Sequence, residues 1–198
     1  MAHVVLLTTG GTIASRREGS AGSVARDSGA ELLAAVPGLD PALSVELREV
    51  HRVNSFNITF SDARVLSDAV ASVLARPEVD GIVITHGTDT LEETAALLDA
   101  IHDDIRPIVL TGAQRGRDIS DSDGPRNLRD ALSVAAAGSS RGRGVLVCFA
   151  GMIFSALGLR KIDTLALQPF LNNLGGPIGR VDDGQPQFRF SPQRQPAI

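Results

Sequence analysis

Four short runs of apolar residues along the chain predict buried strands. They lie at residues 4–7, 81–84, 108–110 and 145–149. Residues 45–53 instead alternate between apolar and polar side chains, which predicts a strand with only one buried face. Each of the five segments is short enough for a strand of a globular domain.

Helical periodicity fills most of the intervals between these strands. It occurs at residues 29–36, 61–75, 91–101 and 125–137. Pro37 ends the first helix, Ser61 and Asp62 are candidate caps of the second, and Pro125 suits the first turn of the fourth. Because strands and helices alternate and the strands are continuously apolar, we expect a parallel sheet covered on both faces. The predicted fold class is α/β, with a doubly wound, mainly parallel, flavodoxin-like sheet.

The C-terminal part of the chain has a different pattern. Residues 178–190 carry two short strand-like segments around an Asp183-Gly184 turn, which predicts a β-hairpin. Residues 191–198 are polar and contain two prolines, as in an interdomain linker. We therefore expect a domain over residues 1–190 and the start of a linker over residues 191–198.

Composition and charge suit one globular domain. The chain has 198 residues, of which 43% are hydrophobic and 21% are charged, and its net charge is −4. A mildly acidic chain has no general attraction to nucleic acid or to an anionic membrane. The N-terminal apolar run is too short for a signal peptide, and no run is long enough to span a membrane. We expect a cytoplasmic protein whose only cysteine, Cys148, is a buried core thiol.

Polar and small residues follow four of the predicted strands. The segments are TGGT (9–12), NSFN (54–57), THGTDT (85–90) and TGAQR (111–115). Since parallel strands end at the same edge of a sheet, these segments are expected to converge on one site. Hydroxyls, one carboxylate and close backbone approach suit a small polar substrate, and backbone N–H groups can stabilise an oxyanion.

Lys161 is the only lysine among 19 basic residues. A threonine hydroxyl becomes a nucleophile only when another group activates it. A lysine can act as that base, whereas an arginine keeps its proton. Lys161 is therefore a candidate base, against the simpler interpretation of a chance surface lysine.

Several motifs together resemble the bacterial-type L-asparaginase/glutaminase family. They are TGGTIA (9–14), HGTDTLEET (86–94), TGAQR (111–115) and SDGPRNL (122–128), in the family's order. The resemblance runs from about residue 4 to residue 190. It implies hydrolysis of L-asparagine to the acid and ammonia through a threonine acyl-enzyme, with L-glutamine as a second candidate substrate and with no metal and no organic cofactor.

The resemblance also implies roles for individual residues. Thr12 matches the nucleophile, and Thr88 matches the threonine that forms a triad with a lysine, here Lys161. Asp89 matches the anchor of the substrate amine, and Ser55 matches the residue that binds its carboxylate. The remaining implied substrate-binding residues are Gly11, Phe56, Gly87 and Ala113, the last through its backbone carbonyl.

This sequence departs from the family pattern in three respects. It has no tyrosine, and the loop segment 18–24, where many members carry a catalytic one, holds only small, polar or aliphatic residues. Phe56 stands where many members have glutamine. We also expect the family's second, smaller C-terminal domain, which completes a neighbouring subunit's site in a homo-oligomer, to be missing, since the sequence stops where the linker would begin.

Simpler interpretations exist for several residues taken singly. His86 suits a structural role, Asp89 an N-cap, and Glu92 and Glu93 the first turn of a helix. For the whole chain, the alternatives are a non-catalytic amino-acid-binding domain, an inactive truncated asparaginase fragment, or an amidotransferase subunit. A nucleotide-binding domain is disfavoured because both the G-x-G-x-x-G and the G-x-x-x-x-G-K-[ST] loops are lacking.

Overall fold

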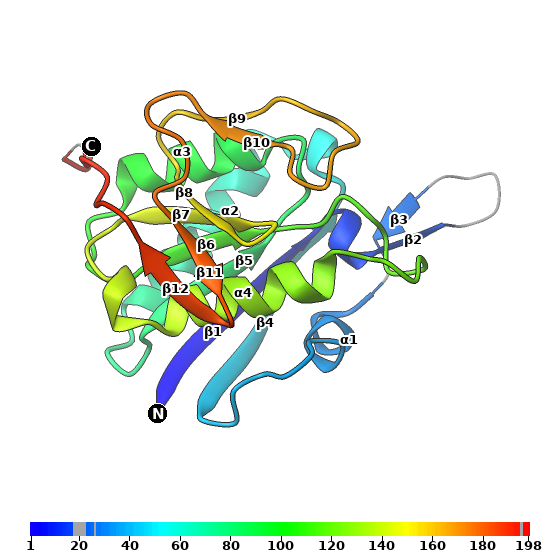
Figure 1. Cartoon of the computed structure of the whole chain (residues 1–198), viewed down its shortest axis with the longest axis horizontal. Helices are drawn as coiled ribbons and strands as arrows, with labels where there is room; N and C mark the ends of the chain where they lie inside the picture. The colour runs from blue at the N-terminus through cyan, green and yellow to red at the C-terminus, as the bar shows by residue number, and fades with distance from the viewer. Residues whose placement is uncertain (18–22, 26, 195) are drawn as a thin grey trace.

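The computed structural model describes residues 1–17, 23–25, 27–194 and 196–198. Its centre is an eight-stranded sheet in the order β12-β11-β8-β7-β6-β5-β1-β4 (Figure 1). Five adjacent strands of this sheet are parallel. They are β1 (Ala2–Gly10), β4 (Leu43–Val53), β5 (Gly81–Thr85), β6 (Ile108–Thr111) and β7 (Val145–Phe149).

The order β4-β1-β5-β6-β7 is the flavodoxin-like order 2-1-3-4-5, so the predicted fold class is confirmed. Three strands then extend the sheet with antiparallel pairing. They are β8 (Met152–Ser155), β11 (Gly179–Asp182) and β12 (Gln185–Phe188). The last two form the expected hairpin, and Asp183 and Gly184, both with positive φ, are its two turn residues.

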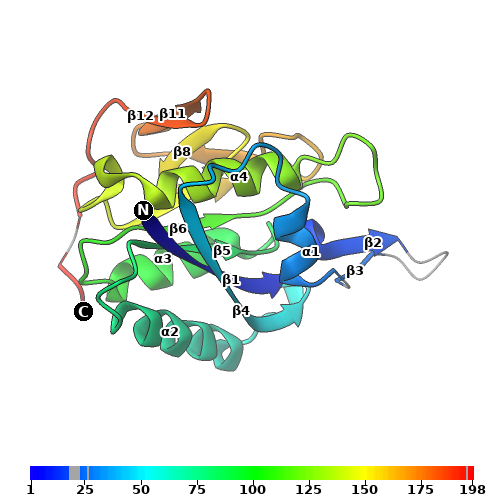
Figure 2. The same ribbon diagram turned by 90° about the horizontal axis from the view of Figure 1, so that it is seen from below.

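Helices cover both faces of the sheet (Figure 2). On one face lie α2 (Phe60–Leu74) and α3 (Leu91–Ile101), and on the other lie α1 (Gly29–Ala34) and α4 (Gly124–Ala136). Each pair encloses its own apolar core against the sheet, one built around Val5, Leu7 and Ile84 and the other around Leu6, Val83 and Leu128. Three single turns of 3-10 helix complete the helical set: η1 (Thr12–Ala14), η2 (Ser55–Asn57) and η3 (Gly138–Ser140).

One expected helix cap was wrong. The N-cap of α2 is Thr59, not Ser61 or Asp62. The Thr59 hydroxyl accepts the Asp62 N–H, and the Asp62 carboxylate accepts the Thr59 N–H at 2.8 Å. This capping box gives hydrogen-bond acceptors to two N–H groups that have no partner within the helix. It therefore makes Thr59 the N-cap and Phe60 the first helical residue.

Two small hairpins were not expected from the sequence. They are β2 (Ser15–Arg17) with β3 (Ser23–Ala25), and β9 (Leu159–Lys161) with β10 (Phe170–Asn172). Strands of three residues are too short to show a periodicity. The second hairpin lies above α3 in Figure 1 and carries the only lysine of the chain.

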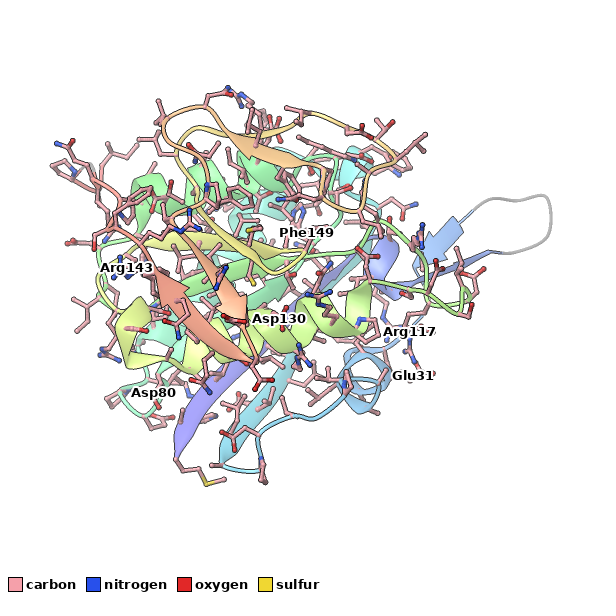
Figure 3. The ribbon with its side chains drawn as sticks, viewed as in Figure 1. Glu31, Asp80, Arg117, Asp130, Arg143 and Phe149 are labelled. Atoms are coloured by element: carbon pink, nitrogen blue, oxygen red, sulfur yellow. The ribbon has the colours of Figure 1, made fainter. Side chains whose placement is uncertain are left out.

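The segment that follows β12 lies against the body of the domain. The Arg143 guanidinium, labelled in Figure 3, donates to the Phe190 carbonyl at 2.9 Å and to Ser191 Oγ at 2.7 Å. Further along, the Ile198 N–H donates to the Ala100 carbonyl at 2.9 Å. The residues interpreted as a linker are thus held on the same side of the domain as the end of α3. Among the described residues, no helix is long and apolar enough to cross a membrane.

Candidate functional site

The carboxyl ends of β1, β4 and β5 meet closely, as the motif positions predicted. A Cβ atom on Gly11 would lie 2.4 Å from the Gly87 nitrogen, and one on Gly87 would lie 2.5 Å from Ser55 Oγ. Gly11 also has a φ of 79°, in the region that favours glycine. Only glycine at both positions allows the three strand ends to approach this closely.

Thr12 is held directly beside this contact. It opens the single turn η1, in which the Ala14 N–H and the Ser15 hydroxyl both donate to the Gly11 carbonyl, at 3.0 and 2.8 Å. The Thr12 hydroxyl, half-buried, makes no recorded hydrogen bond to another residue in the described part of the chain.

Arg117 and Asp27 also hold the segment that follows Thr12. The Arg117 N–H donates to the Ser15 carbonyl at 3.3 Å, and its guanidinium lies 3.1 Å from the buried Asp27 carboxylate. The Asp27 N–H in turn donates to the Ala14 carbonyl at 2.9 Å. Figure 3 shows Arg117 at the point where α1 approaches the β2–β3 hairpin. The residues that follow Thr12 are thus fixed from two sides.

Ser55 lies in η2 and faces the start of the β5–α3 loop. Its hydroxyl accepts the Asp89 N–H at 3.2 Å, and its carbonyl accepts the Thr90 hydroxyl at 2.9 Å. Ser55 is buried, whereas the neighbouring Phe56 is 66% exposed and lies outside this cluster of hydrogen bonds. The two adjacent residues therefore differ sharply in environment, although the resemblance gave both a substrate-binding role.

Lys161 connects the two side chains of the central motif. Its ammonium donates to Thr88 Oγ1 at 2.8 Å and to Asp89 Oδ1 at 2.7 Å. Thr88 is buried, whereas Asp89 is exposed. The structure thus brings three of the four predicted catalytic residues together, and its Lys161–Asp89 ion pair argues against Asp89 as a helix cap. The residue before α3 is Thr90, whose side chain makes no capping hydrogen bond.

Three contacts hold Lys161 at this point. Lys161 pairs with Phe170 across the β9–β10 hairpin. The buried Phe170 ring meets Phe149, labelled in Figure 3 at the end of β7, edge to face with 5.2 Å between ring centroids. The Glu92 carboxylate accepts the Lys161 N–H and also binds the Arg160 guanidinium at 2.9 Å. Helix α3 and strand β7 therefore both locate the lysine.

The sequence predicted only part of the role of Glu92. It does lie in the first turn of α3 together with Glu93, as predicted. Its side chain nevertheless binds the backbone of Lys161, so it links the central motif to the lysine-bearing hairpin. The HGTDTLEET motif contains Glu92, but no local pattern could show a partner that lies 69 residues away.

His86 has the structural role expected of it. Its Nδ1 lies 2.8 Å from the Gly87 carbonyl, which can only accept, so Nδ1 carries the hydrogen. Its Nε2 then accepts the Thr94 hydroxyl at 3.0 Å. Burial lowers the pKa of His86 from 6.5 to about 4, so the ring is neutral at physiological pH. It fixes the backbone on which Gly87 and Thr88 lie.

The turn around Ala113 is held by Asp123. This carboxylate accepts the Gln114 N–H at 3.0 Å and the Arg115 N–H at 2.9 Å. Asn127 donates to the same carboxylate at 3.1 Å and to the Gly112 carbonyl at 3.0 Å. The SDGPRNL motif thus orients the backbone of the TGAQR motif, which is how Ala113 is positioned beneath the site.

Beside Lys161 the surface has an open, shallow hollow. It is lined by Asp89, Glu92, Lys161, Ile162, Asp163, Thr164 and Leu165. Within the described residues, no group of three or more His, Cys, Asp or Glu side chains is arranged to hold a metal ion. The loop segment that lacks a tyrosine lies largely outside the described residues. Cys148 is buried as expected, and this burial raises the pKa of its thiol.

Comparison with known proteins agrees with the motif order. The family model described as "Asparaginase, N-terminal" matches residues 3–194. Probable L-asparaginase 4 of Schizosaccharomyces pombe is 37% identical over 96% of this chain and 54% of its own length. Glutaminase-asparaginase of Pseudomonas aeruginosa is 35% identical over 100% of this chain and 56% of its own.

A solved structure gives the same result for the fold. The probable cytoplasmic L-asparaginase from Campylobacter jejuni superposes with a TM-score of 0.89 at 30% identity, over 98% of this chain and 58% of that chain. The chain thus spans somewhat more than half the length of these relatives. On the match to residues 3–194, this chain belongs to the asparaginase family, within that family's N-terminal region.

Proposed function

We propose that the chain is the site-bearing part of an amidohydrolase that converts L-asparagine to L-aspartate and ammonia. The observation that carries the proposal is the bridge of Lys161 Nζ between Thr88 Oγ1 and Asp89 Oδ1. A lysine between a buried hydroxyl and a carboxylate is suited to move a proton during acyl transfer. The names of the relatives, L-asparaginase and glutaminase-asparaginase, support the same reaction.

In the proposed reaction, Thr12 Oγ attacks the side-chain amide carbon of asparagine. Lys161, in its neutral form and with one N–H still bonded to Thr88 Oγ1, takes the Thr12 proton on its lone pair and passes it to the amide nitrogen, which leaves as ammonia. Water then hydrolyses the acyl-threonine ester and releases L-aspartate, which restores Thr12. No metal and no organic cofactor is required by these steps.

Substrate contacts are assigned on the same basis. We assign the substrate carboxylate to Ser55 and the adjoining backbone of Gly11 and Gly87, and the substrate amine to Asp89. The Ala113 carbonyl accepts from the leaving amide nitrogen. Phe56, which is 66% exposed, stands where many family members have glutamine, so this position bears on the balance between L-asparagine and L-glutamine.

Cytoplasmic location, a homo-oligomer and a C-terminal domain that completes the site belong to the same proposal. They rest on the resemblance to the family and, for location, on the relative from Campylobacter jejuni that is described as a probable cytoplasmic L-asparaginase. The competing function is a non-catalytic amino-acid-binding domain. The hydrogen-bonded Thr88–Lys161 pair favours the enzyme, because binding alone does not need a lysine beside a buried hydroxyl.

The test is ammonia release from L-asparagine by the purified 198-residue chain, beside a Thr88→Val variant. Release by the wild type that the variant lacks supports the proposal. If neither protein releases ammonia, the assay is repeated with the C-terminal part of a relative supplied as a separate domain. Binding of L-asparagine without release in both assays would instead establish a binding domain.

A further inference from the structure

The hydroxyl of Thr88 has two polar neighbours with opposite requirements. Lys161 Nζ lies 2.8 Å away and Gln114 Oε1 lies 3.1 Å away. An ammonium group can only donate a hydrogen bond, and an amide oxygen can only accept one. Thr88 Oγ1 therefore accepts from Lys161, and its single hydrogen is directed at Gln114.

The orientation of the Gln114 amide is fixed independently. Its Nε2 donates to the Thr164 carbonyl at 3.2 Å and to the Ala166 carbonyl at 3.0 Å. Because both partners only accept, the NH₂ group must face them, and Oε1 must face Thr88. The Gln114 backbone is held as well, since its N–H donates to the Asp123 carboxylate.

We propose that Gln114 is a positioning residue, which fixes the direction of the Thr88 hydroxyl and so presents a lone pair of Thr88 to Lys161. The expected effect on kcat rests on the proposed function, whereas the hydrogen bonds that place Gln114 do not. The same side chain ties Thr88 to the loop of Thr164 and Ala166, which follows Lys161 in the chain. Thr88 and the lysine-bearing hairpin thus keep one mutual arrangement.

Removing the amide frees the Thr88 hydroxyl to rotate away from the geometry that the reaction needs. We expect Gln114→Met, which keeps the length of the side chain but neither hydrogen bond, to lower kcat about 10–100-fold. KM for L-asparagine should change by less than about threefold, because the assigned contacts of the substrate carboxylate and amine are retained. Gln185→Met, an exposed glutamine on the β11–β12 hairpin, is the matched control and should leave both constants unchanged.

A second readout does not depend on activity. Because Lys161 is the only lysine, protein made with labelled lysine gives one side-chain NMR signal. Gln114→Met should change the chemical shift of this signal in the wild-type background, and Gln185→Met should not. If Gln114 acts through the Thr88 hydroxyl, Gln114→Met should cause little further change once Thr88→Val has removed that hydroxyl.

The outcomes separate this inference from the proposed function. A wild type that releases no ammonia contradicts the function, while the lysine signal still tests the positioning role. An unchanged kcat in an active enzyme, or no movement of the signal, would overturn the role. The role would also be overturned if Gln114→Met changed the chemical shift of the lysine signal equally in the Thr88→Val background. That result would mean that Gln114 acts on Lys161 through the 164–166 loop alone. If Gln114→Met does not fold, Gln114→Asn, too short to reach all three partners, replaces it in each measurement.

Discussion

Lys161 Nζ lies 2.8 Å from Thr88 Oγ1, although 73 residues separate them in the chain. The contact exists because Phe170, the partner of Lys161 in the β9–β10 hairpin, packs on Phe149 and because Glu92 binds the Lys161 backbone. The same ammonium is paired with Asp89 at 2.7 Å. Most of the predictions below test what depends on this arrangement.

Lys161→Arg should abolish activity while leaving the fold intact. Arginine keeps the charge that pairs with Asp89, but it cannot release a proton to act as a base. We expect turnover to fall about 10²–10⁴-fold, with little change in the melting temperature. Ammonia release and thermal unfolding measure the two effects, and near-normal turnover would exclude Lys161 as the base.

Asp89→Asn should raise KM for L-asparagine sharply and also lower kcat. The substrate amine loses its charged partner, and Lys161 loses the carboxylate 2.7 Å from its ammonium. Steady-state kinetics separate the two effects. Asp68→Asn, which changes an exposed acid on helix α2, is the control and should change neither constant by more than about twofold. An unchanged KM in Asp89→Asn would refute the amine contact.

Glu92→Ala should lower activity through the position of Lys161. The variant removes the acceptor of the Lys161 N–H and the partner of Arg160, so the β9 strand is released from α3. We expect a loss of about 1–3 kcal/mol in the free energy of unfolding, since a buried donor loses its partner, and a lower kcat. Glu93→Ala is the matched control, because Glu93 has the same charge on the same helical turn and is exposed. Equal effects of the two variants would mean that only the helix terminus matters.

Gly11→Ala should be more damaging than Gly38→Ala. Both glycines have positive φ, but a Cβ at residue 38 would meet nothing within 4 Å, whereas one at residue 11 would lie 2.4 Å from the Gly87 nitrogen. Backbone strain costs roughly 1–3 kcal/mol at such positions, and Gly11, with a ψ of −176°, lies in a region essentially confined to glycine. The overlap adds about 1–3 kcal/mol at residue 11 and displaces the turn that holds Thr12. Urea unfolding of both variants measures the difference, and equal losses would contradict the close approach.

Stability should fall as the pH is lowered from 6.5 towards 4, in part because of His86. Its pKa is about 4 in the folded protein against 6.5 for a free histidine, so the unfolded state binds the proton first. Neutral His86 therefore makes its full contribution to stability above pH 6.5. Below that pH the free energy of unfolding falls by up to about 1.4 kcal/mol per pH unit. Urea unfolding at several pH values should show a smaller slope for His86→Gln than for the wild type. The same slope in both would show that His86 is not the group responsible.

The sequence by itself determined the sheet and the place of the site within it. Continuous apolar runs such as 81–84 and 145–149 can be satisfied only by burial on both faces, and this burial predicted a parallel sheet between helices. Since parallel strands end at one edge, the TGGT and THGTDT segments had to meet there. The segments that contain Ser55, Gly87 and Thr88 were predicted on this reasoning, and Lys161 was singled out as a candidate base because it is the chain's only lysine.

Only the tertiary structure decided how the site is held. Glu92, Gln114 and Asp123 act through hydrogen bonds to backbone and side-chain atoms of other loops, which leave no periodicity and no composition signal. The β9–β10 hairpin was likewise missed, because three-residue strands obtain their stability from packing such as Phe170 on Phe149 and not from local propensity. The sequence thus specifies which groups reach the edge of the sheet, and long-range packing specifies which of them touch.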